Sequence, residues 1–159
     1  MVKRLPARKR IRLAPPVYQG PRAFSVTIST ANRQNLFCDE SAVGLCLSAL
    51  TEATARQEMT ILAYCFMPDH LHLVLEGKEG ANLIRLMKTF KQISAYRYRQ
   101  TSGQPLWQKG YYDHILRKEE DARGVAQYIF ENPVRARLVI SPHEYPFLGG
   151  TLLAGLRAT

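Results

Sequence analysis

Two apolar segments on either side of the short turn Pro68-Asp69 constrain the fold of this chain more than any other feature. The segment before the turn, residues 59–67, has the composition of a strand. Proline and aspartate supply the chemistry of a chain reversal. The segment after the turn, residues 70–76, alternates histidine with leucine, continues as Leu73-Val74-Leu75 and ends at Glu76. A β-hairpin is therefore predicted over residues 59–76.

The alternation places two histidines on one face of the second strand. Side chains in a strand alternate with a period of two, so His70 and His72 leave the same face. The leucines at positions 71, 73 and 75 leave the other face and would hold the strand against a core. Two imidazole nitrogens from one strand could therefore bind the same divalent cation and supply two of its ligands. The alternative is a solvated strand face with nothing bound, because a metal needs more than two ligands.

Length and composition predict one globular domain. The chain has 159 residues, of which 46% are hydrophobic and 22% charged, as is ordinary for a soluble domain. The longest mostly apolar stretch, residues 61–67, is too short to cross a bilayer, and the basic N-terminus lacks a secretory leader. The three cysteines, Cys38, Cys46 and Cys65, favour reduced structural thiols in a cytoplasm, and their spacing excludes a zinc ribbon.

The net charge of +9 is concentrated near the N-terminus. Residues 1–38 contain basic residues and no acid, whereas the basic and acidic residues of positions 39–159 nearly balance. A basic arm over residues 1–21 suits the phosphate backbone of a nucleic acid or an acidic membrane surface. The alternative is a solvated terminus without a partner. The basic residues of positions 1–38 are Lys3, Arg4, Arg8, Lys9, Arg10, Arg12, Arg22 and Arg33.

The remaining periodicity predicts an α+β fold. The other predicted elements are a strand over 22–30, a helix from Asp39 to about Gln57, a helix from Asn82 that ends before Gly103, a strand over 111–117 and a helix from Lys118 to about Asn132. This order matches a ferredoxin-like split βαβ arrangement, with two helices on one face of a four-stranded antiparallel sheet. The extra C-terminal helix is free to pack on the other face, where the histidine pair would lie.

That last helix carries a second pair of functional side chains. Tyr128 and Asn132 are four residues apart, so they share a helix face about 6 Å apart along the axis. If the helix crosses the open sheet face, a phenol and an amide oxygen approach the imidazoles. A divalent cation could polarise a phosphodiester for attack by the phenol, which would leave a phosphotyrosine. The alternatives are a packing role for Tyr128 and a helix-end role for Asn132.

Three blocks of the sequence together resemble the single-tyrosine HUH transposases of the insertion-sequence superfamily, and most closely the REP-associated tyrosine transposases of bacteria. The blocks are Met67-Pro-Asp-His-Leu-His-Leu-Val74, Leu106-Trp-Gln-Lys-Gly-Tyr-Tyr-Asp-His-Ile115 and Tyr128-Ile-Phe-Glu-Asn-Pro-Val-Arg-Ala136. The resemblance spans residues 22–148. It leaves residues 1–21 as the basic arm and residues 149–159 as a C-terminal tail.

The resemblance implies a transposase that cleaves and rejoins single-stranded DNA beside hairpins of a repeated palindromic element. It implies Mg²⁺ or Mn²⁺ held by His70, His72 and Asn132, and a 5′-phosphotyrosine formed on Tyr128. It also implies a bacterial, cytoplasmic, nucleoid-associated protein without a membrane partner, acting as a monomer or a homodimer. The competing hypotheses are a catalytically silent hairpin-binding relative and a zinc hydrolase that uses His114 or His143 as a further ligand.

DNA contacts are predicted from basic and aromatic side chains, which pair with phosphates and stack on bases. The predicted DNA-binding residues are Arg4, Arg8, Lys9, Arg10, Arg12, Arg85, Lys88, Arg135 and Trp107. For those on the helix from Asn82 and for the tryptophan, the alternative is a solvated helix face with buried aromatics. His114 is an auxiliary candidate, with a structural role as the alternative. Asp69 is predicted to be a turn residue rather than a ligand.

Overall fold

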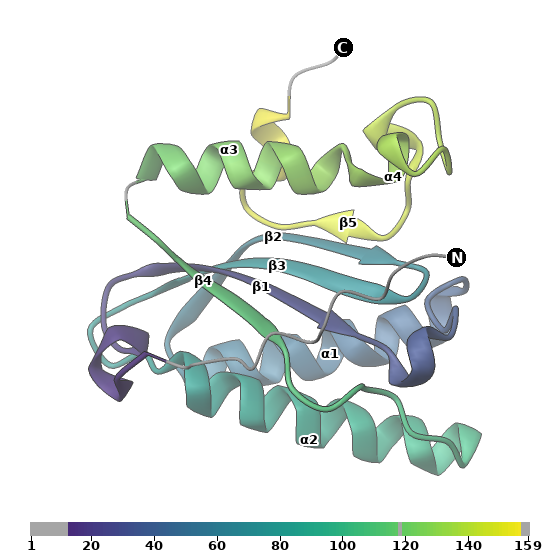
Figure 1. Cartoon of the computed structure of the whole chain (residues 1–159), viewed down its shortest axis with the longest axis horizontal. Helices are drawn as coiled ribbons and strands as arrows, with labels where there is room; N and C mark the ends of the chain where they lie inside the picture. The colour runs from purple at the N-terminus through teal and green to yellow at the C-terminus, as the bar shows by residue number, and fades with distance from the viewer. Residues whose placement is uncertain (1–12, 118, 157–159) are drawn as a thin grey trace, which may run out of the picture.

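The computed structural model describes residues 13–117 and 119–156, which form an antiparallel sheet with helices on both faces (Figure 1). The strand order is β4-β1-β3-β2-β5. The strands are β1 (Ala23–Ser29), β2 (Met59–Met67), β3 (His70–Gly77), β4 (Tyr112–Leu116) and β5 (Leu148–Gly149). The helices are α1 (Glu40–Arg56), α2 (Leu83–Ser102), α3 (Glu119–Phe130) and α4 (Asn132–Arg135). Short 3₁₀ helices are η1 (Pro15–Tyr18), η2 (Ala31–Arg33), η3 (Pro142–Glu144) and η4 (Leu153–Gly155).

This architecture confirms the predicted α+β class, with one correction. The sheet has five strands rather than four, because β5 pairs with β2 at the edge of the sheet. β5 is only two residues long, so it carries no alternation that a sequence pattern could reveal. The residues that follow it, expected as a tail, continue along β2: the amides of Thr151 and Leu152 donate to the carbonyls of Ile61 and Leu62.

Capping residues in the sequence determine where α1 and α2 begin and where α2 ends; these two helices cover one face of the sheet. Asp39 caps α1, since its Oδ1 accepts hydrogen bonds from the amides of Ser41 and Ala42 at 2.9 and 3.2 Å. Asn82 caps α2 by accepting a hydrogen bond from the amide of Arg85 at 3.1 Å. α2 stops at Gly103, whose φ of 71° lies in the left-handed region that glycine adopts without strain.

Two hydrophobic cores lie on opposite sides of the sheet. The larger core packs the leucines of β3 and the apolar residues of β1 against α1 and α2. The smaller core packs α3 against the other face, through Ala122, Ala126 and Ile129 on the helix and residues such as Val74 below it. α3, which carries Tyr128 and is named the tyrosine helix, therefore covers the face opposite α1 and α2 (Figure 1). His70 and His72 project from this face, since the leucines between and after them point into the larger core.

The end of this helix differs slightly from the prediction. α3 ends at Phe130, and after Glu131 the chain makes one further helical turn, α4, that contains Pro133. Proline is tolerated there because its missing N–H falls in the first turn, where no intrahelical acceptor is required. Asn132 thus begins α4 instead of ending α3.

Candidate metal site and tyrosine helix

The hairpin between β2 and β3 determines where the histidines point. Met67 pairs with His70 across the two-residue turn, as predicted. Leu71, Leu73 and Leu75 are fully buried in the larger core. The imidazoles leave the opposite face, beneath α3, where both are half-buried.

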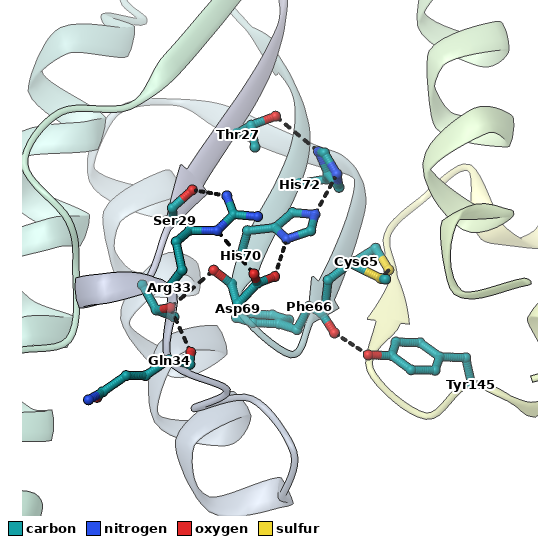
Figure 2. A network of polar contacts seen from close by, with 12 residues as sticks. Thr27, Ser29, Arg33, Gln34, Cys65, Phe66, Asp69, His70, His72 and Tyr145 are labelled. Atoms are coloured by element: carbon teal, nitrogen blue, oxygen red, sulfur yellow. Dashed lines mark hydrogen bonds and ion pairs between the residues drawn. The ribbon is translucent and has the colours of Figure 1, made fainter. Parts of the chain in front are cut away.

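The two imidazoles meet through their outer nitrogens (Figure 2). The Nε2 atoms of His70 and His72 are 3.0 Å apart, and the ring planes are perpendicular, with centroids 4.7 Å apart. Two nitrogens that converge on one point from one strand provide a cis pair of ligand atoms. The sequence prediction that both histidines share one face is confirmed.

Each histidine is held from behind by its other ring nitrogen. His70 Nδ1 lies 2.7 Å from Asp69 Oδ1, and His72 Nδ1 lies 2.9 Å from Thr27 Oγ1, on the neighbouring strand β1. A carboxylate only accepts hydrogen bonds, so Nδ1 of His70 carries a proton and Nε2 presents a lone pair. The threonine hydroxyl can rotate to donate or accept, so His72 can also present a lone pair at Nε2.

This donor set fits a divalent cation. With both Nδ1 atoms engaged, neutral His70 and His72 can direct two Nε2 lone pairs at the same position. Outer hydrogen bonds of this kind orient histidine ligands and set their tautomers in metal sites. The 3.0 Å separation is that of a hydrogen bond, which His72 Nε2–H can donate to the lone pair of His70 Nε2.

A second layer of contacts supports Asp69. Arg33 Nε lies 3.0 Å from Asp69 Oδ2, and Arg33 Nη1 donates to Ser29 Oγ at 2.9 Å. The network therefore starts and ends on β1, at Ser29 and Thr27, and passes through both histidines (Figure 2). Arg33 itself has a φ of 55°, in the left-handed region that is uncommon for a residue other than glycine.

Asp69 thus has a role that the sequence prediction missed. It is a turn residue, as predicted, but its carboxylate also orients the first histidine. Burial acts to raise the pKa of Asp69, but the hydrogen bond from His70 and the charge of Arg33 outweigh it and lower the pKa. A carboxylate next to a candidate ligand histidine was the signal that could have revealed this role.

Electrostatics keep His72 neutral at neutral pH. Burial, followed by the charge that His70 carries when it is protonated and by the charges of Arg135 and Arg33, lowers the pKa of His72 to about 4. Cys65 lies directly opposite His72 on β2, and burial raises the pKa of its thiol to about 12. A neutral imidazole is the form that binds metal, whereas the protonated thiol is not a ligand.

Tyr128 lies in the last turn of α3, Asn132 begins α4, and Arg135 contacts both. The Tyr128 side chain is exposed, and the Arg135 guanidinium carbon stacks 3.6 Å from the centre of its ring. Arg135 Nη2 also donates to the Tyr128 carbonyl at 2.6 Å and to Asn132 Oδ1 at 3.4 Å. α4, which contains Asn132 and Arg135, contacts β2, the strand that pairs with the histidine strand β3.

No hydrogen bond within residues 13–117 and 119–156 joins Tyr128 or Asn132 directly to the histidines. Their roles as nucleophile and third ligand therefore stay predictions. What the structure establishes is that α3, which carries Tyr128, packs over the sheet face from which the imidazoles project, and that α4, which begins at Asn132, contacts β2 beside it.

The other two histidines do not complete a zinc site. His114 on β4 pairs with Ser25 of β1, two strands away from β3, which corresponds to roughly 10 Å across the sheet. His143 is exposed on η3. Within the described part of the chain, no group of three or more His, Cys, Asp or Glu side chains could hold a metal ion.

Few of the predicted DNA-binding residues lie near the histidine pair. Arg4, Arg8, Lys9, Arg10 and Arg12 fall outside the described residues. Arg85 and Lys88 are exposed on α2, which covers the opposite face of the sheet (Figure 1).

The Trp107 side chain packs against other side chains of the protein. Its indole N–H donates to Ser94 Oγ at 2.8 Å, and its ring contacts Phe37 and Phe90. These contacts explain the position of the indole ring without any contact to DNA. Stacking of Trp107 on bases therefore stays a prediction. Arg135 is the one residue of the predicted DNA-binding set that contacts Tyr128 in the described part of the chain.

The fold and site define a class of protein: an α+β domain with a histidine pair on the sheet face covered by a tyrosine-bearing helix. The family model of the IS200-like transposases matches residues 23–132. The chain belongs to the IS200-like transposase family.

Relatives in this family include two REP-associated tyrosine transposases. A Haemophilus influenzae protein described as belonging to this group is 26% identical in an alignment of 115 positions, which covers 63% of this chain and 64% of the relative. The REP-associated tyrosine transposase of Escherichia coli K12 is 23% identical over 99 residues, covering 62% and 59%. The chain thus spans less than two thirds of the length of both curated relatives.

Solved structures show the same fold. A REP-associated tyrosine transposase bound to a REP hairpin superposes with a TM-score of 0.73 at 20% identity, covering 88% of this chain and 81% of that one. A Deinococcus radiodurans R1 protein described as a transposase gives a TM-score of 0.54 at 24% identity, covering 76% and 95%. In the part of the chain that the structure describes, none of the helices is long and apolar enough to cross a membrane.

Proposed function

We propose that this chain is a metal-dependent endonuclease and strand-transferase that acts on single-stranded DNA beside hairpins. The observation that carries the proposal is the convergence of His70 Nε2 and His72 Nε2, 3.0 Å apart, with each Nδ1 held by a second residue. Two solvated histidines without a ligand would not require this support. The convergence lies on the sheet face that the tyrosine helix covers.

His70, His72 and Asn132 are the residues that would hold Mg²⁺ or Mn²⁺. Imidazole nitrogens and an amide oxygen are acceptable ligands for Mn²⁺, while Mg²⁺ favours oxygen and retains water. When bound, the cation supplies positive charge that polarises a phosphodiester and offsets the charge that develops on it. Asp69 and Thr27 keep the imidazoles oriented for this task.

Tyr128 is proposed as the nucleophile. Its phenolic oxygen attacks the phosphorus of the scissile phosphodiester, and the bond from phosphorus to the 3′-oxygen breaks. The products are a 5′-phosphotyrosine and a free 3′-hydroxyl, with the phenolic proton released to water and the leaving oxygen protonated by water. The covalent link conserves the energy of the broken bond, so a 3′-hydroxyl can reverse the step and rejoin a strand.

A DNA hairpin is the proposed partner. This follows from the relative whose structure contains a REP hairpin and from the excess of basic residues at positions 1–38. A cleft beside His114, lined also by Leu116, Asp121, Gly124 and Val125, opens between β4 and α3 on the site's side of the sheet. It offers a path for the single strand next to the tyrosine helix.

The test uses a labelled oligonucleotide with a hairpin and single-stranded flanks, incubated with the full chain and Mn²⁺. We expect a covalent adduct on a denaturing gel, with the linked peptide mapped to Tyr128 by mass spectrometry and no adduct in EDTA. Hairpin binding without cleavage, across hairpins taken from repeated palindromic elements, would favour the catalytically silent hairpin-binding protein instead. An adduct at another tyrosine would remove Tyr128 from the mechanism.

A further inference from the structure

Arg135 is connected to Tyr128 at the end of α3 and to Asn132 at the start of α4 by three different contacts. Its guanidinium carbon lies 3.6 Å from the centre of the Tyr128 ring. Its Nη2 atom donates to the carbonyl of Tyr128 at 2.6 Å and also reaches Asn132 Oδ1 at 3.4 Å. One planar group therefore contacts the backbone and ring of the proposed nucleophile and the amide of the proposed third ligand.

Neither the hydrophobic core nor the regular helix fixes the positions of Tyr128 and Asn132 relative to each other. Tyr128 is 63% exposed, so the core does not fix its ring. Asn132 lies beyond the end of α3, after Glu131, so the regular helix does not fix its position relative to Tyr128. A cation over an aromatic ring restricts the ring, and a hydrogen bond to Oδ1 selects which way the amide is turned.

We infer that Arg135 is a positioning residue that fixes Tyr128 and Asn132 relative to each other, so that both approach the histidine pair in one arrangement. The inference rests on the proposed function for its catalytic meaning. A planar guanidinium suits this task better than an ammonium, because it can stack on a ring and donate along its edge at the same time. Glu131 Oε2 lies 3.9 Å from Arg135 Nη1 and forms a longer ion pair with the same guanidinium.

The contrasting role is a direct contact with DNA phosphate, and the two roles differ in what they change. A positioning residue alters the rate of the covalent step at saturating DNA and metal. A phosphate contact alters the affinity for DNA and its salt dependence. Arg137, two residues further on and also exposed, provides a control that removes the same charge without touching Tyr128 in the described structure.

The experiment compares Arg135→Gln, Arg135→Lys and Arg137→Gln with the wild type. We expect Arg135→Gln to lower the single-turnover rate of adduct formation by about 100-fold, as small misplacements of reacting groups do. Arg135→Lys should recover only a minor part of this loss, and the dissociation constant for the hairpin should match that of Arg137→Gln. Wild-type rates in Arg135→Gln or full recovery in Arg135→Lys would overturn the inference, as would an effect on affinity alone.

A second measurement does not depend on cleavage. Fluorotyrosine placed at position 128 of the full chain reports the surroundings of the ring by ¹⁹F NMR. We expect the resonance to shift in Arg135→Gln and Arg135→Lys, and to stay unchanged in Arg137→Gln. If the wild type forms no adduct, the proposed function fails and this measurement alone decides the inference: an unchanged resonance in Arg135→Gln would overturn it.

Discussion

The carboxylate of Asp69 accepts a hydrogen bond from Nδ1 of His70 at 2.7 Å, so a turn residue orients the first histidine of the strand that follows. Arg33 holds the other carboxylate oxygen at 3.0 Å. The hairpin turn therefore takes part in the geometry of the candidate metal site as well as in the reversal of the chain.

We expect Asp69→Ala to weaken Mn²⁺ binding by about 10 to 100-fold, because outer partners of histidine ligands contribute that much to metal affinity. Arg33→Gln should have a smaller effect, since the hydrogen bond between Asp69 and His70 would survive it. Calorimetric titration of the folded proteins with Mn²⁺ measures both. Unchanged affinity in Asp69→Ala would show that the carboxylate serves only the turn.

Tyr128→Phe should abolish the covalent DNA adduct while leaving metal and hairpin binding intact, because only the attacking oxygen is removed. The side chain is exposed, so the free energy of unfolding should change by less than about 0.5 kcal/mol. Tyr112→Phe is the matched control, since Tyr112 is also exposed. An adduct that persists in Tyr128→Phe and disappears in Tyr112→Phe would assign the nucleophile to β4.

Leu71→Ala should lower the free energy of unfolding by about 2 to 5 kcal/mol, because Leu71 is fully buried in the larger core. It stands between the two histidines in sequence but on the opposite face of β3. Mn²⁺ affinity, measured where the variant is folded, should therefore stay within about threefold of the wild type. Denaturant titration gives the stability, and a loss below 1 kcal/mol would contradict the packing described for this face.

His72 should make the metal-free protein less stable in mild acid. Its pKa is about 4 in the folded chain, against 6.5 ordinarily, because of burial and nearby positive charge. Below about pH 6.5 the unfolded chain binds a proton that the folded chain excludes, so stability falls as the pH drops from about 6.5 to 4. The slope is up to about 1.4 kcal/mol per pH unit. Denaturant titrations in EDTA check this, and His72→Gln should have a shallower slope.

Removal of residues 1–12 should weaken DNA binding and flatten its salt dependence. Each lost phosphate contact to a single strand takes about 0.7 from the slope of log affinity against log salt concentration. The cut is placed after residue 12 because Tyr18 is buried and its hydroxyl accepts a hydrogen bond from the amide of Leu13. Fluorescence anisotropy at several salt concentrations gives the slope, and an unchanged slope would mean that the arm does not contact phosphate.

The elements with strong local signals could be predicted from the sequence. Asp39 and Asn82 cap the helices they were expected to begin, and the alternation after Asp69 predicted both faces of β3. Strand β5 could not be predicted, because a two-residue pairing depends on the edge that β2 presents rather than on its own residues.

The candidate site could be predicted only in part. The histidine pair follows from strand periodicity, but Thr27 comes from another strand, and its contact with His72 depends on the pairing of β1 with β3. The left-handed conformation of Arg33 has no signal in the sequence, although it accompanies the contact with Asp69. The stacking of Arg135 on Tyr128 joins residues on either side of the break after α3, a break that the sequence prediction did not include.

The alternation along β3 also determines which genetic changes this chain can tolerate. Substitution of a histidine would remove a candidate ligand and leave the leucine face of the strand in its core. Insertion or deletion of one residue next to the turn would instead exchange the two faces, placing imidazoles in the larger core and leucines beneath α3. We therefore expect functional descendants of this sequence to keep the length of the turn, because a change in length disturbs both faces of the strand whereas a substitution disturbs one.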